Sequence, residues 1–595
     1  MPEFPPALLL IFGAALVPIL PLAARRIYVI ALPLAALAYI FGLPHGEFAQ
    51  ITLLQGFGEM TGLRVDKLSK AFGIIFTLNA VIAFLFAFYV KRSDQHVAAL
   101  VYIGGALGVV FAGDLISVYI YWELMAVAST FIILARQTER AKGAAFRYLL
   151  IHIVGGLILL AGIVLTIGAQ GSIAFDPFSW DARHLGTWLI LVGVLVNAAA
   201  PPFSAWLSDA YPEASVTGGL ILSAYTTKTS VYVLLRGFTD PGNAAHEAWP
   251  ILIVVGCVMA LYGIIFALLE NDMRRILAYS IINQVGFMVC AAGVGTSMAV
   301  DGAVAHAFCH IIYKSLLWMS AGAVLYRVGK SKCTELGGLY KTMPLTLIFG
   351  TIGALAISAL PFTSGFTSKT MIVSDIHHHA ELFWAWLVLE IASAGVFLHA
   401  GIKFPYFVFF NKDRGHRPKE APKTMLIAMA ILAFFCILLG CWKAPLYALL
   451  PNGGLDSYTG ETYQPYKWAK IITQMQLLMF SALVFFLFLK LLKRTPTIVL
   501  DTDWFYRKFG KIGYRFADGL FNTLNATVHR VVVISGLGKL GAFLAKGPQE
   551  VVGALGDMFA GESSDKIAER LRSGTFPIGL AALFGMLLFA LLYFL

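Results

Sequence analysis

Two stretches of the sequence decide the fold: HAFCHIIYKSLL (His306 to Leu317) and LPFTSGFTSKT (Leu360 to Thr370). Both lie in strongly apolar sequence, and each contains a lysine, Lys314 or Lys369. An ammonium group at membrane depth costs about 2.5–3.5 kcal/mol on insertion scales, and more where it faces lipid. We therefore expect both lysines to face the interior of a helix bundle or a hydrated cavity.

The first stretch carries a titratable row. His306, His310 and Lys314 follow one another at intervals of four residues, so a helix places all three on one face. The second stretch contains proline and glycine, as expected of a helix that is broken inside the membrane. A titratable row that leads to a broken helix is typical of a path for ions.

The composition indicates an integral membrane protein. The chain has 595 residues, of which 59% are hydrophobic and only 13% are charged, whereas soluble domains carry about 25% charged residues. The net charge of +11 needs no nucleic acid as a partner, because membrane proteins collect lysine and arginine in cytoplasmic loops. The six cysteines show no metal-ligand spacing, so we predict neither a metal site nor a cofactor.

Sixteen apolar runs are long enough to cross a bilayer core of about 30 Å. They predict an all-α, polytopic membrane bundle of about 16 transmembrane helices. The runs lie near residues 5–24, 27–43, 71–90, 97–113, 115–135, 148–169, 186–203, 215–235, 250–270, 275–295, 302–326, 345–370, 382–410, 425–450, 471–493 and 575–595.

The chain divides into six parts. Residues 494–574 carry apolar side chains at helical spacing between basic ones, which favours an amphipathic helix along the membrane surface or against another protein of the complex. The alternative for this segment is a soluble helical hairpin. The parts are N-terminal transmembrane helices (1–96), a first repeat (97–240), a second repeat (250–410), C-terminal transmembrane helices (425–493), the amphipathic lateral helix (494–574) and a final transmembrane helix (575–595).

The loops set the orientation. Basic residues concentrate in the loops after odd-numbered runs, whereas loops after even-numbered runs hold more Asp and Glu. The positive-inside rule then puts the odd loops in the cytoplasm and both termini on the non-cytoplasmic side.

Further ionisable groups lie inside the apolar runs. Glu123 occupies the middle of the fifth run, Lys228 lies in the eighth, and Glu390, His399 and Lys403 lie in the thirteenth. A single buried charge is commonly part of a static ion pair, but so many of them favour transport. Burial lowers the pKa of an ammonium group and a nearby carboxylate raises it, so changing their separation moves a proton. Glu123 is the expected switching carboxylate. Lys403 lies near the end of its run, where it could instead reach the membrane surface.

The two broken segments point to an internal repeat. VLVNAAAPPFSAWL (Val194 to Leu207) and ISALPFTSGFTSKT (Ile357 to Thr370) are both apolar helices interrupted near proline, in the seventh and twelfth runs. Because the offset of five runs is odd, the second copy is inverted in the membrane, which is the plan of inverted-repeat transporters.

At these residues the sequence resembles a known family. Its most specific pieces are Trp122-Glu123, PPFSAWLSDAYPEASVT (Pro201 to Thr217), LENDMRRILAYSIINQVGFM (Leu269 to Met288), HAFCHIIYKSLL and GFTSK (Gly365 to Lys369). Over about residues 60–450 they resemble the antiporter-like subunits of Mrp-type cation/proton antiporters, respiratory complex I and membrane-bound hydrogenases. TTKTSVYVLLR is most similar to the Mrp D subunit, whereas the amphipathic helix and sixteenth run look more like the terminal antiporter-like subunit of complex I.

The resemblance implies two half-channels around a hydrated axis in an energy-transducing cell membrane, with other membrane subunits as partners. It assigns proton translocation to Glu123, Lys228, Lys314 and Lys369, with His306 and His310 as relays. One departure stands out: the family's lysine of the seventh run falls at Asn197, which cannot titrate. Lys228 is the candidate to replace it as the partner of Glu123.

The expected function is that of a proton-translocating, antiporter-like subunit of a multisubunit complex, with Na⁺ or another cation as a candidate counter-ion. The alternative is a transport-inactive scaffold or anchoring subunit, which Asn197 favours. A quinone-binding redox enzyme is disfavoured, since the sequence has no CxxC and no GxGxxG after a strand. A haem site is disfavoured because His306 and His310 share one helix. Any redox catalysis would belong to partner subunits.

Overall fold

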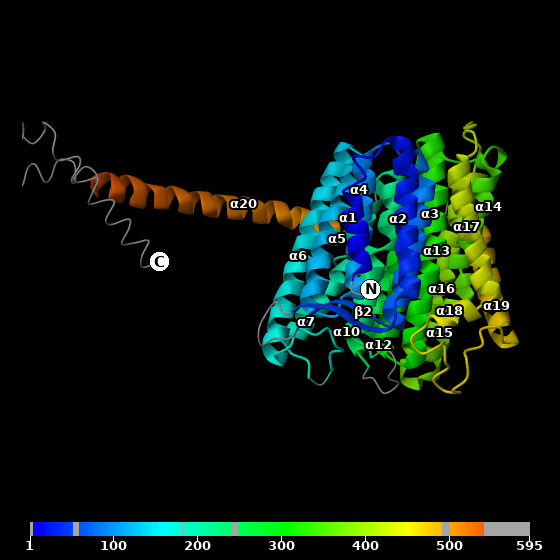
Figure 1. Ribbon diagram of the computed structural model, residues 1–595. Coiled ribbons are helices and arrows are strands. Elements are labelled where there is room, and N and C mark those ends of the chain that lie inside the picture. Colours follow the sequence, from blue (N-terminus) through cyan, green and yellow to red (C-terminus); the bar gives the residue numbers. More distant parts are fainter. Residues whose placement is uncertain are drawn as a thin grey trace, which may run out of the picture. The chain divides into compact units, whose positions relative to one another are not determined.

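The structure is a computed structural model, shown in Figure 1, that describes residues 4–51, 59–180, 182–240, 248–490, 495 and 500–540. The chain splits into two compact units, Met1–Asp503 and Trp504–Leu595. The predicted sixteenth run, 575–595, and the predicted amphipathic segment beyond residue 540 lie outside the described residues.

The first unit is a helical bundle. Its first helices are α1 (Pro6–Ala14), α2 (Leu22–Gly42), α3 (Lys67–Phe86), α4 (Ser93–Phe111), α5 (Leu115–Leu134), α6 (Glu139–Gln170), α7 (Leu185–Asn197), α8 (Ala205–Ala210), α9 (Val216–Ala224) and α10 (Thr226–Gly237). The later ones are α11 (Pro250–Leu269), α12 (Met273–Val294), α13 (Ser297–Val328), α14 (Pro344–Ile357), α15 (Ser364–His378), α16 (Phe383–Val396), α17 (Lys423–Cys441), α18 (Ala444–Ala448) and α19 (Trp468–Leu487). Two π-helical stretches, Phe397–Lys403 and Tyr406–Phe410, follow α16.

Local sequence fixes where several helices begin and end. The side chains of Asp66, Thr138 and Thr296 accept hydrogen bonds from backbone N–H groups in the first turns of α3, α6 and α13. Gly171 and Gly329 end α6 and α13 with positive φ angles of 67° and 73°, a conformation that glycine adopts without steric cost.

The predicted spans are largely confirmed. Among the described residues, eleven helices are long and apolar enough to cross a membrane, and α7 and α14 are shorter apolar helices. Every predicted run from 5–24 to 471–493 contains a helix; the full count of sixteen spans stays a prediction. The all-α prediction missed a small hairpin between α2 and α3, in which β1 (Gly46–Ile51) pairs antiparallel with β2 (Met60–Val65). Asp114 anchors this hairpin by accepting a hydrogen bond from the Thr61 backbone at 2.9 Å.

Two helix breaks have the same hydrogen-bond pattern 160 residues apart. After α7, Ala199 has a φ of 63°, and the N–H of Ala200 donates to the carbonyl of Leu195 at 3.0 Å. After α14, Ala359 has a φ of 57°, and the N–H of Leu360 donates to the carbonyl of Leu355 at 3.1 Å. We call residues 198–204 the first break and residues 358–363 the second break.

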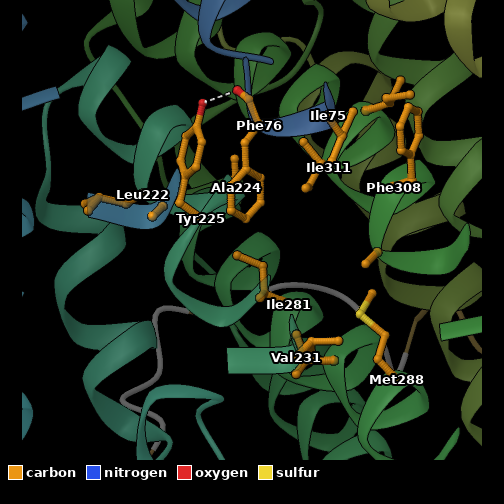
Figure 2. Close-up of a cluster of buried hydrophobic side chains, with 14 of the residues drawn as sticks. Ile75, Phe76, Leu222, Ala224, Tyr225, Val231, Ile281, Met288, Phe308 and Ile311 are labelled. Atoms are coloured by element: carbon orange, nitrogen blue, oxygen red, sulfur yellow. Dashed lines mark hydrogen bonds between the residues drawn. The ribbon is translucent and has the colours of Figure 1, made fainter. Parts of the chain in front are cut away.

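A buried hydrophobic core surrounds the interior helices. Figure 2 shows part of this core, where Phe76 of α3, Val231 of α10, Ile281 of α12 and Ile311 of α13 lie around a common centre. Tyr225, which separates α9 from α10, donates its hydroxyl to the carbonyl of Phe76 at 3.0 Å (Figure 2). α12 and α13 are almost fully buried, so their polar residues can face only other helices.

Helix α20 (Asp503–Val528) and the π-helical stretch His529–Leu537 continue the chain. Large apolar side chains on α20 are exposed, and basic residues lie among them. The exposed apolar set includes Phe505, Phe509, Ile512, Phe516, Leu520 and Leu524. The helix predicted for the start of the amphipathic segment is therefore present.

Candidate functional site

Helix α13 carries the titratable row predicted from its spacing. His306, His310 and Lys314 are all fully buried. Among the described residues, neither ring nitrogen of His310 nor Nζ of Lys314 has a hydrogen-bond partner. Buried polar groups in proteins are normally satisfied by protein or by water. The unpaired nitrogens of His310 and Lys314 therefore need hydrogen bonds to water, or a proton that can move between them.

His306 joins this row to two neighbouring helices. Its Nδ1 lies 3.1 Å from the hydroxyl of Ser368 on α15, and its Nε2 lies 3.2 Å from Oε1 of Gln284 on α12. The Tyr313 hydroxyl donates to the same Gln284 oxygen at 3.2 Å. The imidazole can pass a proton between its two nitrogens, so it connects α12 and α15 through α13.

Lys228 belongs to the same region of the interior. Its Nζ donates to the backbone carbonyl of Ser223 at 2.7 Å and to the Thr227 hydroxyl at 3.2 Å, beside the irregular residue that separates α9 from α10. Its charge acts on His310 and on Lys314. The structure thus places Lys228 with the α13 row.

Lys369 reaches back to the second break. Its Nζ donates to the carbonyl of Ile357 at 3.0 Å and lies 5.3 Å from the ring centre of Phe287. The carbonyls at the C-terminal end of a helix carry partial negative charge and favour a cation. Because Ser368 contacts His306, Lys369 follows the α13 row directly along α15.

The first break is closed by a neutral donor instead. The indole N–H of Trp206 donates to the carbonyl of Val196 at 2.9 Å. Asp209 stands 160 residues before Lys369, and its carboxylate pairs with Arg147 at 2.7 Å. The two breaks therefore share a backbone geometry, but only the carbonyl at the second break accepts from a titratable side chain among the described residues.

Glu123 lies apart from the lysine row. It is half-buried on α5, and its Oε1 is buried without a hydrogen-bond partner among the described residues. A Cβ added at Gly156 of α6 would lie 1.8 Å from this oxygen, so a larger residue there would displace the carboxylate from its present position. In the described part of the chain, no ion pair within 4.0 Å joins Glu123 to Lys228. The predicted pairing of these two residues is absent from this conformation.

Asn197 ends α7 and is fully buried, and neither atom of its amide has a hydrogen-bond partner among the described residues. It lies near Gly155, whose added Cβ would be 4.0 Å from the amide oxygen. The residue at the position of the family lysine therefore faces the α6 glycines, next to the one that accommodates Glu123.

Besides Asn197, three accessory candidates come from the thirteenth predicted run, and they differ in their surroundings. Lys403 does not reach the surface: it is 1% exposed, and its Nζ donates to the carbonyls of Ala267, Leu268 and Glu270 at the end of α11. Nδ1 of His399 lies 2.8 Å from the carbonyl of Gly395. Glu390 is half-buried on α16 and acts electrostatically on Lys369. Glu390 is thus coupled to the lysine at the second break, and His399 lies within the electrostatic reach of Lys314, Lys369 and Lys403.

Sequence reasoning missed several polar residues of the path. Gln284, Ser368 and Tyr313 bond directly to His306 or to its partner. A usable signal existed, because Asn283 and Gln284 are adjacent amides inside an apolar run. Among the described residues, no group of three or more His, Cys, Asp or Glu is placed to hold a metal ion.

Comparison with known proteins places this site in a family. Residues 112–397 match the family described as NADH:quinone oxidoreductase/Mrp antiporter, TM. Those residues form an antiporter-like transmembrane domain of this family. The match includes Glu123, Lys228, the α13 row, Lys369 and Glu390, and it confirms the resemblance drawn from the motifs.

Individual relatives agree with this antiporter-like domain. The chain is 30% identical over 399 residues to a probable K⁺/H⁺ antiporter protein of the A/B type from Rhizobium meliloti, covering 64% of this chain and 40% of the relative. It is 27% identical over 567 residues to the A-type protein of the Na⁺/H⁺ antiporter of Alkalihalophilus pseudofirmus, covering 83% of this chain and 69% of the relative. The first relative is named A/B and the second A, and the likeness to the Mrp D subunit stays a prediction.

The fold also has a solved counterpart. A chain in the structure of an Mrp complex from Dietzia sp. aligns with a TM-score of 0.66 at 19% identity, covering 79% of this chain and 98% of that chain. At this identity the likeness establishes the fold of the antiporter-like domain. The chain spans less than half of the Rhizobium relative's length.

Proposed function

We propose that this chain is a proton-translocating, antiporter-like subunit of a multisubunit membrane complex. Protons move along the buried row formed by Lys228, Lys314, His310, His306 and Lys369, in exchange for a cation such as Na⁺. The observation that carries the proposal is Lys314, an ammonium group on a fully buried helix that has no hydrogen-bond partner among the described residues. Such a group is costly unless water or proton transfer accompanies it.

Helix spacing, contacts and charges support an order of groups for the proton path. Lys228 acts on Lys314 and His310, which share one helix face with His306. His306 contacts Ser368, the neighbour of Lys369. Every residue of this order is buried, so a proton that travels along it stays out of the lipid.

The charges supply a reason for movement. Two ammonium groups in a low-dielectric interior disfavour each other's charged form. A proton that arrives at Lys228 therefore favours its loss from Lys314, and the histidines receive it. Lys369 is stabilised as a cation by the C-terminal end of α14, so it is the natural acceptor at the end of the row.

The finer architecture belongs to the same proposal. The matching hydrogen bonds at the two breaks support a pair of inverted repeats. The exposed apolar face of α20 supports a lateral helix that meets a membrane surface or another protein of the complex. The loop charges support cytoplasmic odd loops and non-cytoplasmic termini. The names of the relatives support K⁺ and Na⁺ as candidate counter-ions.

The test is proton flux in vesicles that contain the assembled complex with Lys314→Met. Methionine keeps the length and burial of the side chain but cannot hold a proton, so we expect flux to fall to that of vesicles without the complex. Lys330→Ala is the matched control, because Lys330 is an exposed lysine in the loop after α13.

Normal flux with Lys314→Met would contradict the proposal and favour the alternative, a transport-inactive scaffold in a complex whose other members move the ions. Assembly of the variant complex, followed by gel filtration, separates loss of transport from loss of folding.

A further inference from the structure

A cavity of about 440 Å³ lies between α15, α16 and α19, beside Lys369. Its polar lining includes Ser374 and His377 of α15, Glu390 of α16, and Lys470 of α19. The volume has room for several water molecules. Helix α19 lies outside residues 112–397, so the family match assigns nothing to Lys470.

Exposure rises along the cavity. Lys369 is 2% exposed, Glu390 and Lys470 are half-buried, and His377 is exposed. Lys369, Thr370, Val373, Ser374 and His377 lie on one face of α15, because their spacing follows successive helical turns. The cavity therefore connects a buried lysine to the surface along one helix face.

Fixed polar contacts shape both ends of the cavity. At the inner end, Lys369 donates to the carbonyl of Ile357, and the amide of Gln474 donates to the carbonyl of Ser358 at 3.2 Å. At the outer end, Nζ of Lys470 donates to the Ser374 hydroxyl and to the Tyr463 hydroxyl, each at 2.9 Å. The Lys470 ammonium also lies 4.2 Å from the centre of the Tyr463 ring. Helix α19 thus contributes one residue to each end.

We propose that this cavity is the vestibule through which Lys369 exchanges protons with bulk water, with Glu390 as the intermediate carrier and Lys470 as a positioning residue that promotes release. This inference rests on the proposed function, because it adds an outlet to the same proton row. It assigns a role to α19, which neither the family match nor the sequence motifs include.

The transfer balances in two steps. The Lys369 ammonium gives a proton to the Glu390 carboxylate, leaving a neutral amine and a carboxylic acid. Glu390 then releases the proton to water in the vestibule and becomes a carboxylate again. The Lys470 ammonium in the same cavity favours the carboxylate, so it favours this second step.

The charged groups around Glu390 come from each wall of the cavity. Lys369 and His377 face it from α15, and Lys470 faces it from α19. Lys467 and Asp456 act on Lys470 with opposite signs. Lys369 acts directly on Glu390. Substitution of Lys470 therefore removes one positive charge near Glu390 and leaves the inner lysine, Lys369, in place.

The first experiment measures access. Thr473 lines the cavity and is exposed, so Thr473→Cys, made in a Cys441→Ser background, places one reactive thiol there. The other five native cysteines are buried. A membrane-impermeant sulfonate thiol reagent, added at the face where α19 begins, is expected to label Cys at 473 and to block proton flux. Met479→Cys is the control, because Met479 is exposed on α19 but does not line the cavity.

The second experiment measures the pH dependence of flux. With Lys470→Met, Glu390 is expected to hold its proton to higher pH, so the release-side midpoint rises by about one pH unit, as expected for losing one nearby charge. Lys470→Arg keeps the charge and is expected to restore the original profile. Lys330→Ala is the control for removing an exposed lysine, because Lys330 does not line the cavity.

The two proposals fail in different ways. Suppose that Lys369→Met loses flux, but the thiol reagent does not label Thr473→Cys and the pH profile of Lys470→Met does not shift. These results would contradict the vestibule and leave the proposed proton row supported. Normal flux with Lys369→Met would overturn the row itself. A pH profile that shifts equally in Lys470→Met and Lys470→Arg would show that Lys470 acts through packing, which also contradicts the inference.

Discussion

The two helix breaks have the same backbone hydrogen-bond pattern, but different side chains donate to their carbonyls. At the second break, the ammonium of Lys369 donates to the carbonyl of Ile357 at the end of α14, and Ser368 beside it contacts His306. At the first break, the indole of Trp206 donates to the equivalent region, and Asp209 is held by Arg147. A helix break supplies partial negative charge in both cases. At the second break the group that donates to the freed carbonyl can itself gain and lose a proton, whereas the indole at the first break cannot.

The comparison explains why broken helices alone do not identify a channel. The carbonyls freed by a break need a donor, and tryptophan satisfies them as well as lysine does. Transport adds the requirement that the donor titrates and contacts further titratable groups. The row on α13 meets this requirement beside the second break, whereas Glu123 and Asn197 have no hydrogen-bonded row beside the first among the described residues.

Substitution of Gly365 is expected to disrupt the second break more than any other change considered. A Cβ at this position would lie 1.8 Å from the carbonyl oxygen of Ala356, which is backbone and cannot move aside. The position 160 residues earlier is Ala205, so the first break already accommodates a methyl group. We expect Gly365→Ala to cost about 3 kcal/mol, at the upper end of overpacking effects, and to abolish flux.

Thermal unfolding of the purified protein, followed by scanning fluorimetry, measures this effect. Gly168→Ala is the control, because a Cβ there meets nothing within 4 Å; we expect its midpoint to stay at or slightly above the original. Equal midpoints for the two alanine variants would mean that the second break does not need glycine.

Glu123→Gln is expected to have the smaller effect. The glutamine keeps the shape beside Gly156 but cannot titrate, and Glu123 has no direct contact with the lysine row in the described structure. We expect flux to fall only a few-fold, which corresponds to about 1 kcal/mol, against complete loss for Lys314→Met. Initial proton-flux rates in vesicles measure both. Equal loss in the two variants would show that the first half of the bundle feeds the row directly.

Much of the fold could be predicted because bilayer thickness sets the length of apolar runs. Every run up to 471–493 contains a helix, and the proline-interrupted runs are broken where proline indicated. The hairpin of β1 and β2 was missed, since its strands are short and its anchor, Asp114, lies far along the chain. Such a long-range contact leaves no periodic signal in the strands themselves.

The sequence could predict most of the site residues, but it could not predict all of the contacts between them. Spacing by four gave the α13 row, because α-helical geometry fixes which residues share a face. Pairing of Lys228 with Glu123 stays a prediction, since in this conformation the break at Tyr225 directs Lys228 toward Ser223. Lys470 was missed because it lies near the beginning of a run, where a lysine ordinarily reaches the membrane surface.

We infer above all that the donor at the second break titrates, whereas the donor at the first break only caps a carbonyl. Proton flux and thermal midpoint, measured on Lys369→Met and Trp206→Phe side by side, test it most directly. We expect Lys369→Met to abolish flux, and Trp206→Phe to keep flux while losing about 1–3 kcal/mol of stability for the unsatisfied carbonyl. Retained flux in Lys369→Met, with loss in Trp206→Phe, would contradict the claim.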